Sequence, residues 1–69
     1  METIYRVDGM TCNHCVAHVK QEVGQVPGAI VTALTLDDGL LHVESPAPID
    51  FALIEAAVAE AGDYTVSAS

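Results

Sequence analysis

Apolar residues recur with two different periods along the first half of the chain. In residues 3–7 they alternate and a turn sequence follows, which predicts a strand with one apolar face formed by Tyr5 and Val7. From about Cys15 to Val23 they recur with helical spacing, which predicts a helix whose apolar stripe is Val16, Val19 and Val23. Glycine and proline within residues 24–28 end this helix.

The second half repeats the alternation of strand and helix. β-Branched residues return from Ala29 to Leu36, the sequence Asp37-Asp38-Gly39 predicts a turn, and Leu40 to Glu44 completes a hairpin. After a proline-containing loop, Asp50 is suited to begin a second helix, whose inward face is predicted to carry Phe51, Ile54, Val58 and Ala61. A glycine stops this helix, and residues 64–67 alternate as a last, edge-like strand.

This order of elements predicts a single α+β domain that spans residues 1–69. Each strand-helix-strand half requires a right-handed crossover that lays its helix on the sheet. We therefore expect a ferredoxin-like β-α-β-β-α-β sandwich, with a four-stranded antiparallel sheet covered on one face by two helices. A chain of 69 residues has no room for a catalytic cleft roofed by a second domain.

The net charge of the chain limits the classes of binding partner. Two basic residues stand against ten acidic ones, and the formal net charge of −8 argues against nucleic acid as a partner. The negative charge serves solubility, or it steers the protein toward a surface that carries Lys and Arg. No apolar run is long enough to cross a bilayer and the N-terminus lacks the features of a secretory signal, so we expect no membrane insertion and a cytoplasmic location.

The only two cysteines, Cys12 and Cys15, form a C-x-x-C pair where the first strand leads into the first helix. A bridge between them would close a very short loop and stabilise little, so in a reducing compartment the pair indicates metal binding or redox activity. The positive end of the helix dipole lies at the helix start and stabilises the charged thiolate form of a cysteine there. Soft thiolates suit Cu(I), and two of them leave a coordination position open, whereas structural zinc requires four ligands.

The run Gly9-Met10-Thr11-Cys12-x-x-Cys15 resembles the signature of the heavy-metal-associated domain family, found in bacterial copper chaperones and in the N-terminal modules of copper-transporting P-type ATPases. The resemblance covers nearly the whole chain and includes Val7, Gly9, Pro27-Gly28, Asp38-Gly39, Ala61-Gly62 and Tyr64. It implies the fold predicted above, Cu(I) bound by Cys12 and Cys15, and Met10 packed beneath the loop rather than acting as a ligand.

The resemblance also bears on two residues beside the cysteines. Thr11 resembles the residue that copper-type members of the family carry before the first cysteine, whereas zinc-type members carry an acidic residue at that position. Tyr64 corresponds to the aromatic that bacterial members place near the metal loop. The chain departs from the family pattern at Asp63, which separates Gly62 from Tyr64.

Three histidines allow more than one interpretation. His14 lies between the cysteines, and is compatible with ligation of a second Cu(I) in a copper-bridged dimer, with tuning of the thiolates, or with an exposed residue of no fixed role. His18 follows four residues later, so the two share a helix face if the helix begins early, and that spacing can form a metal site. A solvent-exposed helical histidine is the simpler account of His18. His42 is expected on the surface of a strand.

We expect a non-enzymatic, free-standing Cu(I) chaperone, monomeric without metal, that transfers copper by thiolate exchange to a copper-transporting P-type ATPase and, as a second recipient, to a copper-responsive repressor. The expectation of a free-standing chain rests on Met1 and on the short tail after the last strand. One alternative is a regulatory metal-binding module of such an ATPase. Another is a small thiol-disulfide oxidoreductase, against which the chain length and the order of elements argue.

Overall fold

Six elements follow one another in the predicted order in a computed structural model that describes residues 1–68. The first half contains β1 (Glu2–Asp8), α1 (Asn13–Val23) and β2 (Ile30–Leu34), and the second contains β3 (Leu40–Glu44), α2 (Phe51–Ala61) and β4 (Thr65–Ala68). The ferredoxin-like β-α-β-β-α-β fold is thus confirmed. The last strand begins one residue later than predicted, at Thr65, and β2 ends before Leu36 because Thr35 to Asp38 belong to the turn.

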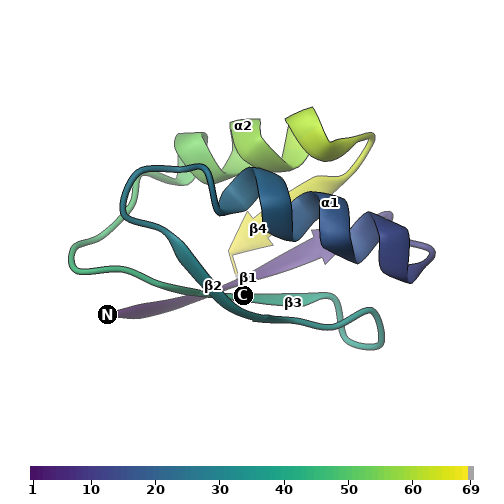
Figure 1. Ribbon diagram of the computed structural model, residues 1–69, viewed down its shortest axis with the longest axis horizontal. Helices are drawn as coiled ribbons and strands as arrows, with labels where there is room; N and C mark the ends of the chain where they lie inside the picture. The colour runs from purple at the N-terminus through teal and green to yellow at the C-terminus, as the bar shows by residue number, and fades with distance from the viewer. Residues whose placement is uncertain (69) are drawn as a thin grey trace.

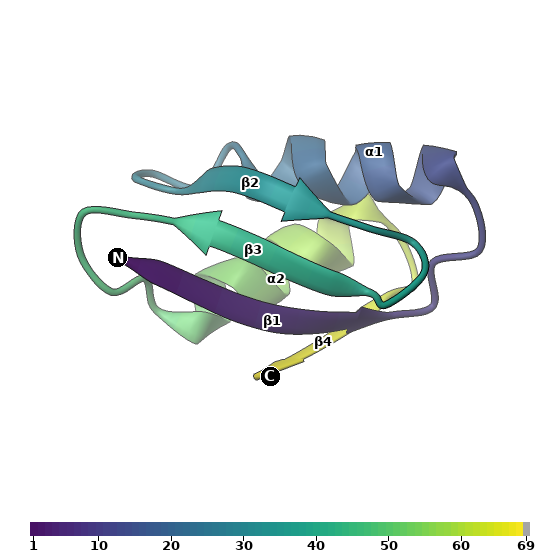
Figure 2. The ribbon, with the colours of Figure 1, turned by 90° about the horizontal axis from the view of Figure 1, so that it is seen from below.

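The four strands form one antiparallel sheet in the order β2-β3-β1-β4. Both helices lie on the same side of this sheet, as Figure 1 shows, and the opposite face is left open toward the viewer in Figure 2. The central strand β1 is hydrogen-bonded on both edges, to β3 and β4. Its C-terminal end leads directly into the loop that precedes α1, so a strand that is paired on both edges carries the candidate site.

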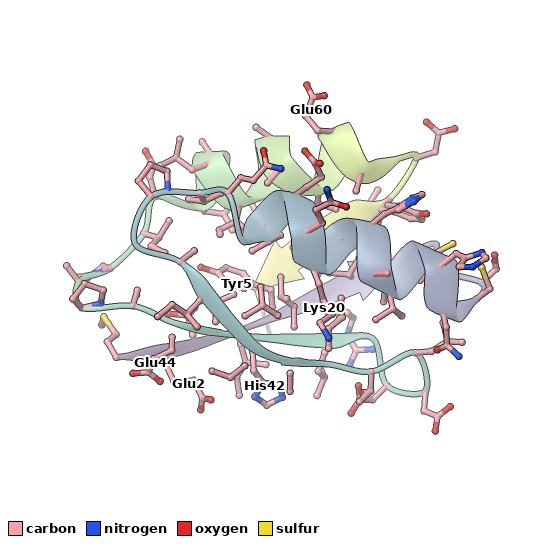
Figure 3. All side chains as sticks on the ribbon, viewed as in Figure 1. Glu2, Tyr5, Lys20, His42, Glu44 and Glu60 are labelled. Carbon is pink, nitrogen blue, oxygen red and sulfur yellow. The ribbon has the colours of Figure 1, made fainter. Side chains whose placement is uncertain are left out.

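Aliphatic side chains of the sheet and the two helices meet in one core. The residues that are fully buried and largest are Leu41, Ile54, Val19, Val23, Val43 and Val58. Tyr5 and Val7 are also buried, so the inward face predicted for the first strand is confirmed, as is the valine stripe of the first helix. Tyr5 points from the sheet toward the helices in Figure 3, while Glu2, His42 and Glu44 project from the other face.

Two expectations about the helices need correction. The first helix begins at Asn13 rather than near Cys15, because the carbonyl of Cys12 already accepts hydrogen bonds from the backbone N–H groups of Cys15 and Val16. Phe51, predicted on the inward face, has a side chain that is 37% exposed. It occupies the first turn of α2, where its ring only meets the edge of the core at 6.1 Å from the ring of Tyr5, and Ala57 is buried instead.

Candidate metal centre

The candidate site is the loop between β1 and α1, together with the first turn of that helix. Sulfur atoms gather at this end of the molecule in Figure 3. Cys12 is the N-cap residue of α1 and Cys15 lies in the first turn, so both stand at the positive end of the helix dipole. Because α1 begins at Asn13 and not near Cys15, both cysteines of the C-x-x-C pair lie at this positive end, where thiolates are stabilised.

The two thiols are close together and reachable from solvent. Their Sγ atoms are 3.6 Å apart, both cysteines are free, and Cys12 is exposed while Cys15 is half-buried. Thr11, which the family resemblance marked only as typical of copper-type members, also takes part, because its hydroxyl oxygen lies 3.9 Å from Cys15 Sγ. The signal available in the sequence was its place next to Cys12, in the loop that precedes the helix.

The environment of Cys15 favours its charged form. The pKa of this thiol is lowered from 9.0 to about 6, first by hydrogen bonding from the Tyr64 hydroxyl and then by the backbone of Thr11 and the side chain of Cys12. The same interaction raises the pKa of Tyr64, because the phenol is needed as a donor. At neutral pH Cys15 is therefore mainly a thiolate, the form that binds metal and acts as a nucleophile.

We expect Cys15 to react with iodoacetamide as a group that ionises near pH 6. Its alkylation rate in the native protein, assigned to Cys15 by tandem mass spectrometry, should be half-maximal about three pH units below that of the unfolded chain. Because the folded-state pKa is the lower one, the thiolate adds stability that is complete above pH 9 and is lost as pH falls through 6. A midpoint that stays near pH 9 in the folded protein would contradict this assignment.

Two further predicted site residues pack around the loop. Met10 is half-buried and packs against the core, as expected of an anchor beneath the loop. Tyr64 is half-buried as well, and its ring lies against Gly9 and Gly62. Although Asp63 separates it from the glycine, Tyr64 still reaches the metal loop, because its N–H donates a 2.8 Å hydrogen bond to the Gly62 carbonyl and turns the chain back.

The histidines do not converge on the cysteines. His14 and His18 are both exposed and fall on one face of α1, but within residues 1–68 no three His, Cys, Asp or Glu side chains are grouped so that they could hold a metal ion. His42 Nδ1 lies 3.6 Å from a carboxylate oxygen of Glu2 on the open face of the sheet. The site is therefore a pair of thiols without a third protein ligand among the described side chains.

Acidic residues cluster beside the loop. A shallow hollow next to Gly9 and Met10 has three carboxylates in its lining, those of Asp8, Asp37 and Asp38. The pKa of Asp38 is lowered, chiefly by its hydrogen bond from the Thr35 hydroxyl, so this side chain is charged. On the other side of the loop, the Asp63 carbonyl approaches Gly9. Arg6 is the one basic residue that lines the hollow.

Among residues 1–68, no helix has both the length and the apolar character that crossing a bilayer requires.

Comparison with known proteins places the chain among metal-binding domains. The model of the heavy-metal-associated domain matches residues 4–63. The COP-associated protein of Helicobacter felis is 39% identical over 56 residues, which cover 81% of this chain and 85% of that protein.

Two solved structures share the fold over almost the whole chain. The CopZ metallochaperone superimposes with a TM-score of 0.84 at 22% identity and covers 97% of this chain and 100% of its own. A copper binding domain from HMA7, a P-type ATPase, also gives 0.84, at 20% identity over 99% of this chain and 92% of its own. With the family model matched from the first strand to Asp63 and the cysteine pair at the start of α1, this chain belongs to the heavy-metal-associated domain family.

Proposed function

We propose that this protein is a cytoplasmic Cu(I) chaperone that holds one copper ion between Cys12 and Cys15 and passes it to a partner by thiolate exchange. The observation that carries the proposal is the pair of free Sγ atoms 3.6 Å apart at an exposed helix start, one of them with a pKa lowered to about 6. Members of the family are non-enzymatic metal-binding proteins, so the chemistry required is binding and release of an ion, not turnover of a substrate.

The two sulfurs are close enough to hold one ion between them. Metal–thiolate bonds are about 2.3 Å long in zinc sites, so two sulfurs 3.6 Å apart can both reach the same ion. Because Cys12 is exposed and Cys15 is only half-buried, the solvent side of the ion is open. A thiolate from a partner enters there, a three-sulfur intermediate forms, and one cysteine of this chain then leaves.

The donor set favours copper over other biological metals. Two soft thiolates without a third ligand among the described side chains do not provide the closed tetrahedral set of structural zinc. Thr11 supports the same choice, because it is the residue of copper-type members of the family. His14 is exposed and adjacent to the pair, so a copper-bridged dimer with His14 as an added ligand remains compatible with the monomeric apo form proposed here.

The charges around the loop point to a basic docking surface on the recipient. Asp8, Asp37 and Asp38 line the hollow next to Met10, within a chain whose formal net charge is −8. Opposite charge on the recipient would raise the rate of encounter. We propose the metal-binding domain of a copper-transporting P-type ATPase as the recipient, which fits the shared fold with the HMA7 domain, and a copper-responsive repressor as a second one.

The second candidate is a regulatory module of such an ATPase. The similarity to the HMA7 domain is the observation that favours it, because this relative is part of a P-type ATPase. The same two cysteines would bind copper in either case. The two functions differ in whether the domain exchanges copper with a separate protein or with a site in its own chain.

Transfer of copper to a separate recipient tests the proposal. We expect the Cu(I)-loaded protein, mixed anaerobically with a basic metal-binding domain of a copper P-type ATPase, to equilibrate its copper with that domain within seconds. Separation of the two by anion exchange and metal analysis of each fraction gives the distribution. The transfer rate should fall steeply, by roughly tenfold or more, between low and physiological ionic strength, because the encounter is steered by charge.

A recipient whose cysteines are replaced by serine serves as the control and should gain no copper. The variant D37N/D38N should show a weaker dependence on salt with the same final distribution of copper, since those charges govern encounter and not affinity. Loaded protein that keeps its copper in the presence of an empty, competent domain would rule out the carrier function and leave the sensing role.

A further inference from the structure

The ring of Tyr64 occupies space that two glycines leave free. A Cβ atom placed on Gly62 would lie 2.8 Å from Cε2 of that ring, 3.2 Å from Cζ and 3.4 Å from the phenol oxygen. A Cβ on Gly9 would lie 3.3 Å from Cδ1 of the same ring and 3.2 Å from the Asp63 carbonyl oxygen. Real Cβ atoms essentially never come within 3.0 Å of another heavy atom, so a side chain at Gly62 cannot coexist with this ring position.

The turn after α2 explains why the ring falls back on Gly62. The N–H of Tyr64 donates to the carbonyl of Gly62, two residues earlier, at 2.8 Å. This tight turn, with Asp63 at its centre, reverses the chain and directs the aromatic side chain toward the loop of Gly9. There the ring lies against Gly9, three residues before Cys12. The residue that departs from the family pattern, Asp63, is thus the one around which the turn is built.

We propose that Gly62 is a positioning residue for copper binding, because the space above it lets the ring of Tyr64 pack against Gly9 and hold the metal loop in place. The inference rests on the proposed function and adds a residue that does not itself touch the metal. Groups that orient a metal ligand from outside the coordination sphere typically contribute about 10–100-fold to metal affinity. Gly9 closes the other side of the same space.

The test is a double-mutant cycle between Gly62 and Tyr64. The Gly62→Ala change should weaken Cu(I) binding about tenfold, measured as competition with a Cu(I) chelator. In a Tyr64→Ala background, which is weakened already, the same change should have almost no further effect, because no ring remains to be displaced. Tyr64→Phe, which keeps the ring, should lose much less affinity than Gly62→Ala.

A spectroscopic readout separates positioning from a structural defect. In the native protein the Tyr64 ring should shift the NMR signals of the Gly9 α-protons, and this shift should be lost in Gly62→Ala as completely as in Tyr64→Ala. Gly28→Ala is the matched control, since Gly28 has a φ of +84° but nothing within 4 Å of the added Cβ. It should show the cost of an alanine in a glycine conformation while copper affinity and the Gly9 shift stay unchanged.

Equal losses of affinity from Gly62→Ala in the native and the Tyr64→Ala backgrounds would overturn the proposal, as would an unchanged Gly9 shift in Gly62→Ala. Failure of the proposed function gives a different pattern, since native protein would then bind no Cu(I) in the same titration. Should Gly62→Ala fail to fold, the Tyr64→Ala variant still decides, because an affinity equal to that of the native protein removes the role assigned to the ring.

Discussion

Replacement of either cysteine by serine should abolish nearly all Cu(I) binding. An anaerobic titration in competition with a Cu(I) chelator is expected to give about one ion per native chain and none held tightly by Cys12→Ser or Cys15→Ser. The reason is the size of the donor set: removal of one sulfur leaves a single thiolate, and no group of three possible metal ligands exists among residues 1–68 to compensate. This is the largest effect on function that we expect from a single substitution.

His18→Ala is the matched control, because His18 is exposed on the same helix and lies outside the pair. It should bind copper as the native protein does. His14→Ala tests whether that residue is a ligand, since a change in the copper stoichiometry or in copper-dependent dimerisation would assign it that role. Retention of tightly bound copper by the double cysteine-to-serine variant would refute the assignment of the site.

The largest effect on stability is expected from Ile54→Ala. Ile54 is fully buried between α2 and the sheet, and removal of such a side chain costs about 2–5 kcal/mol. A domain of 69 residues has a free energy of unfolding of only about 3–10 kcal/mol, so the melting temperature should fall by more than about 10 °C. Thermal unfolding followed by far-UV circular dichroism measures the change.

Leu53→Ala is the matched control on the neighbouring position of the same helix. Its side chain is 50% exposed, so the loss should stay below about 1 kcal/mol. Cu(I) should restore part of the stability of Ile54→Ala, since a ligand at about 1,000 times its dissociation constant adds about 4 kcal/mol to the folded state. An Ile54→Ala protein that melts like Leu53→Ala would show that the core is not organised around α2.

The fold could be predicted from the spacing of apolar residues, because each helix and strand buries one face and its apolar residues recur with the period of that element. Val16, Val19 and Val23 lie at the spacing of a helix, and all three are buried in α1. Alternation placed Tyr5 and Val7 inward with equal success. The prediction failed at Phe51, since periodicity assigns a face of the helix but not the point along it where the underlying sheet ends.

The candidate site was predictable where chemistry depends on neighbours in sequence. Cys12 and Cys15, two residues apart at a strand-to-helix junction, can be recognised as a thiolate pair from spacing alone, although the helix begins two residues earlier than its apolar stripe indicates. The start was missed because Asn13 and His14 are polar and exposed, and so add nothing to the stripe.

What the sequence determined by itself is therefore local: the order of elements, their inward faces and a pair of soft ligands at the start of a helix, each encoded by residues a few positions apart. Tertiary structure decided how Tyr64 reaches the metal loop across about fifty residues, because Gly9 and Gly62 leave room for its ring. It also decided which carboxylates surround the loop. These contacts join residues that are far apart in the sequence. They arise because strands pair and the chain returns after α2, so a pattern of neighbouring residues cannot predict them.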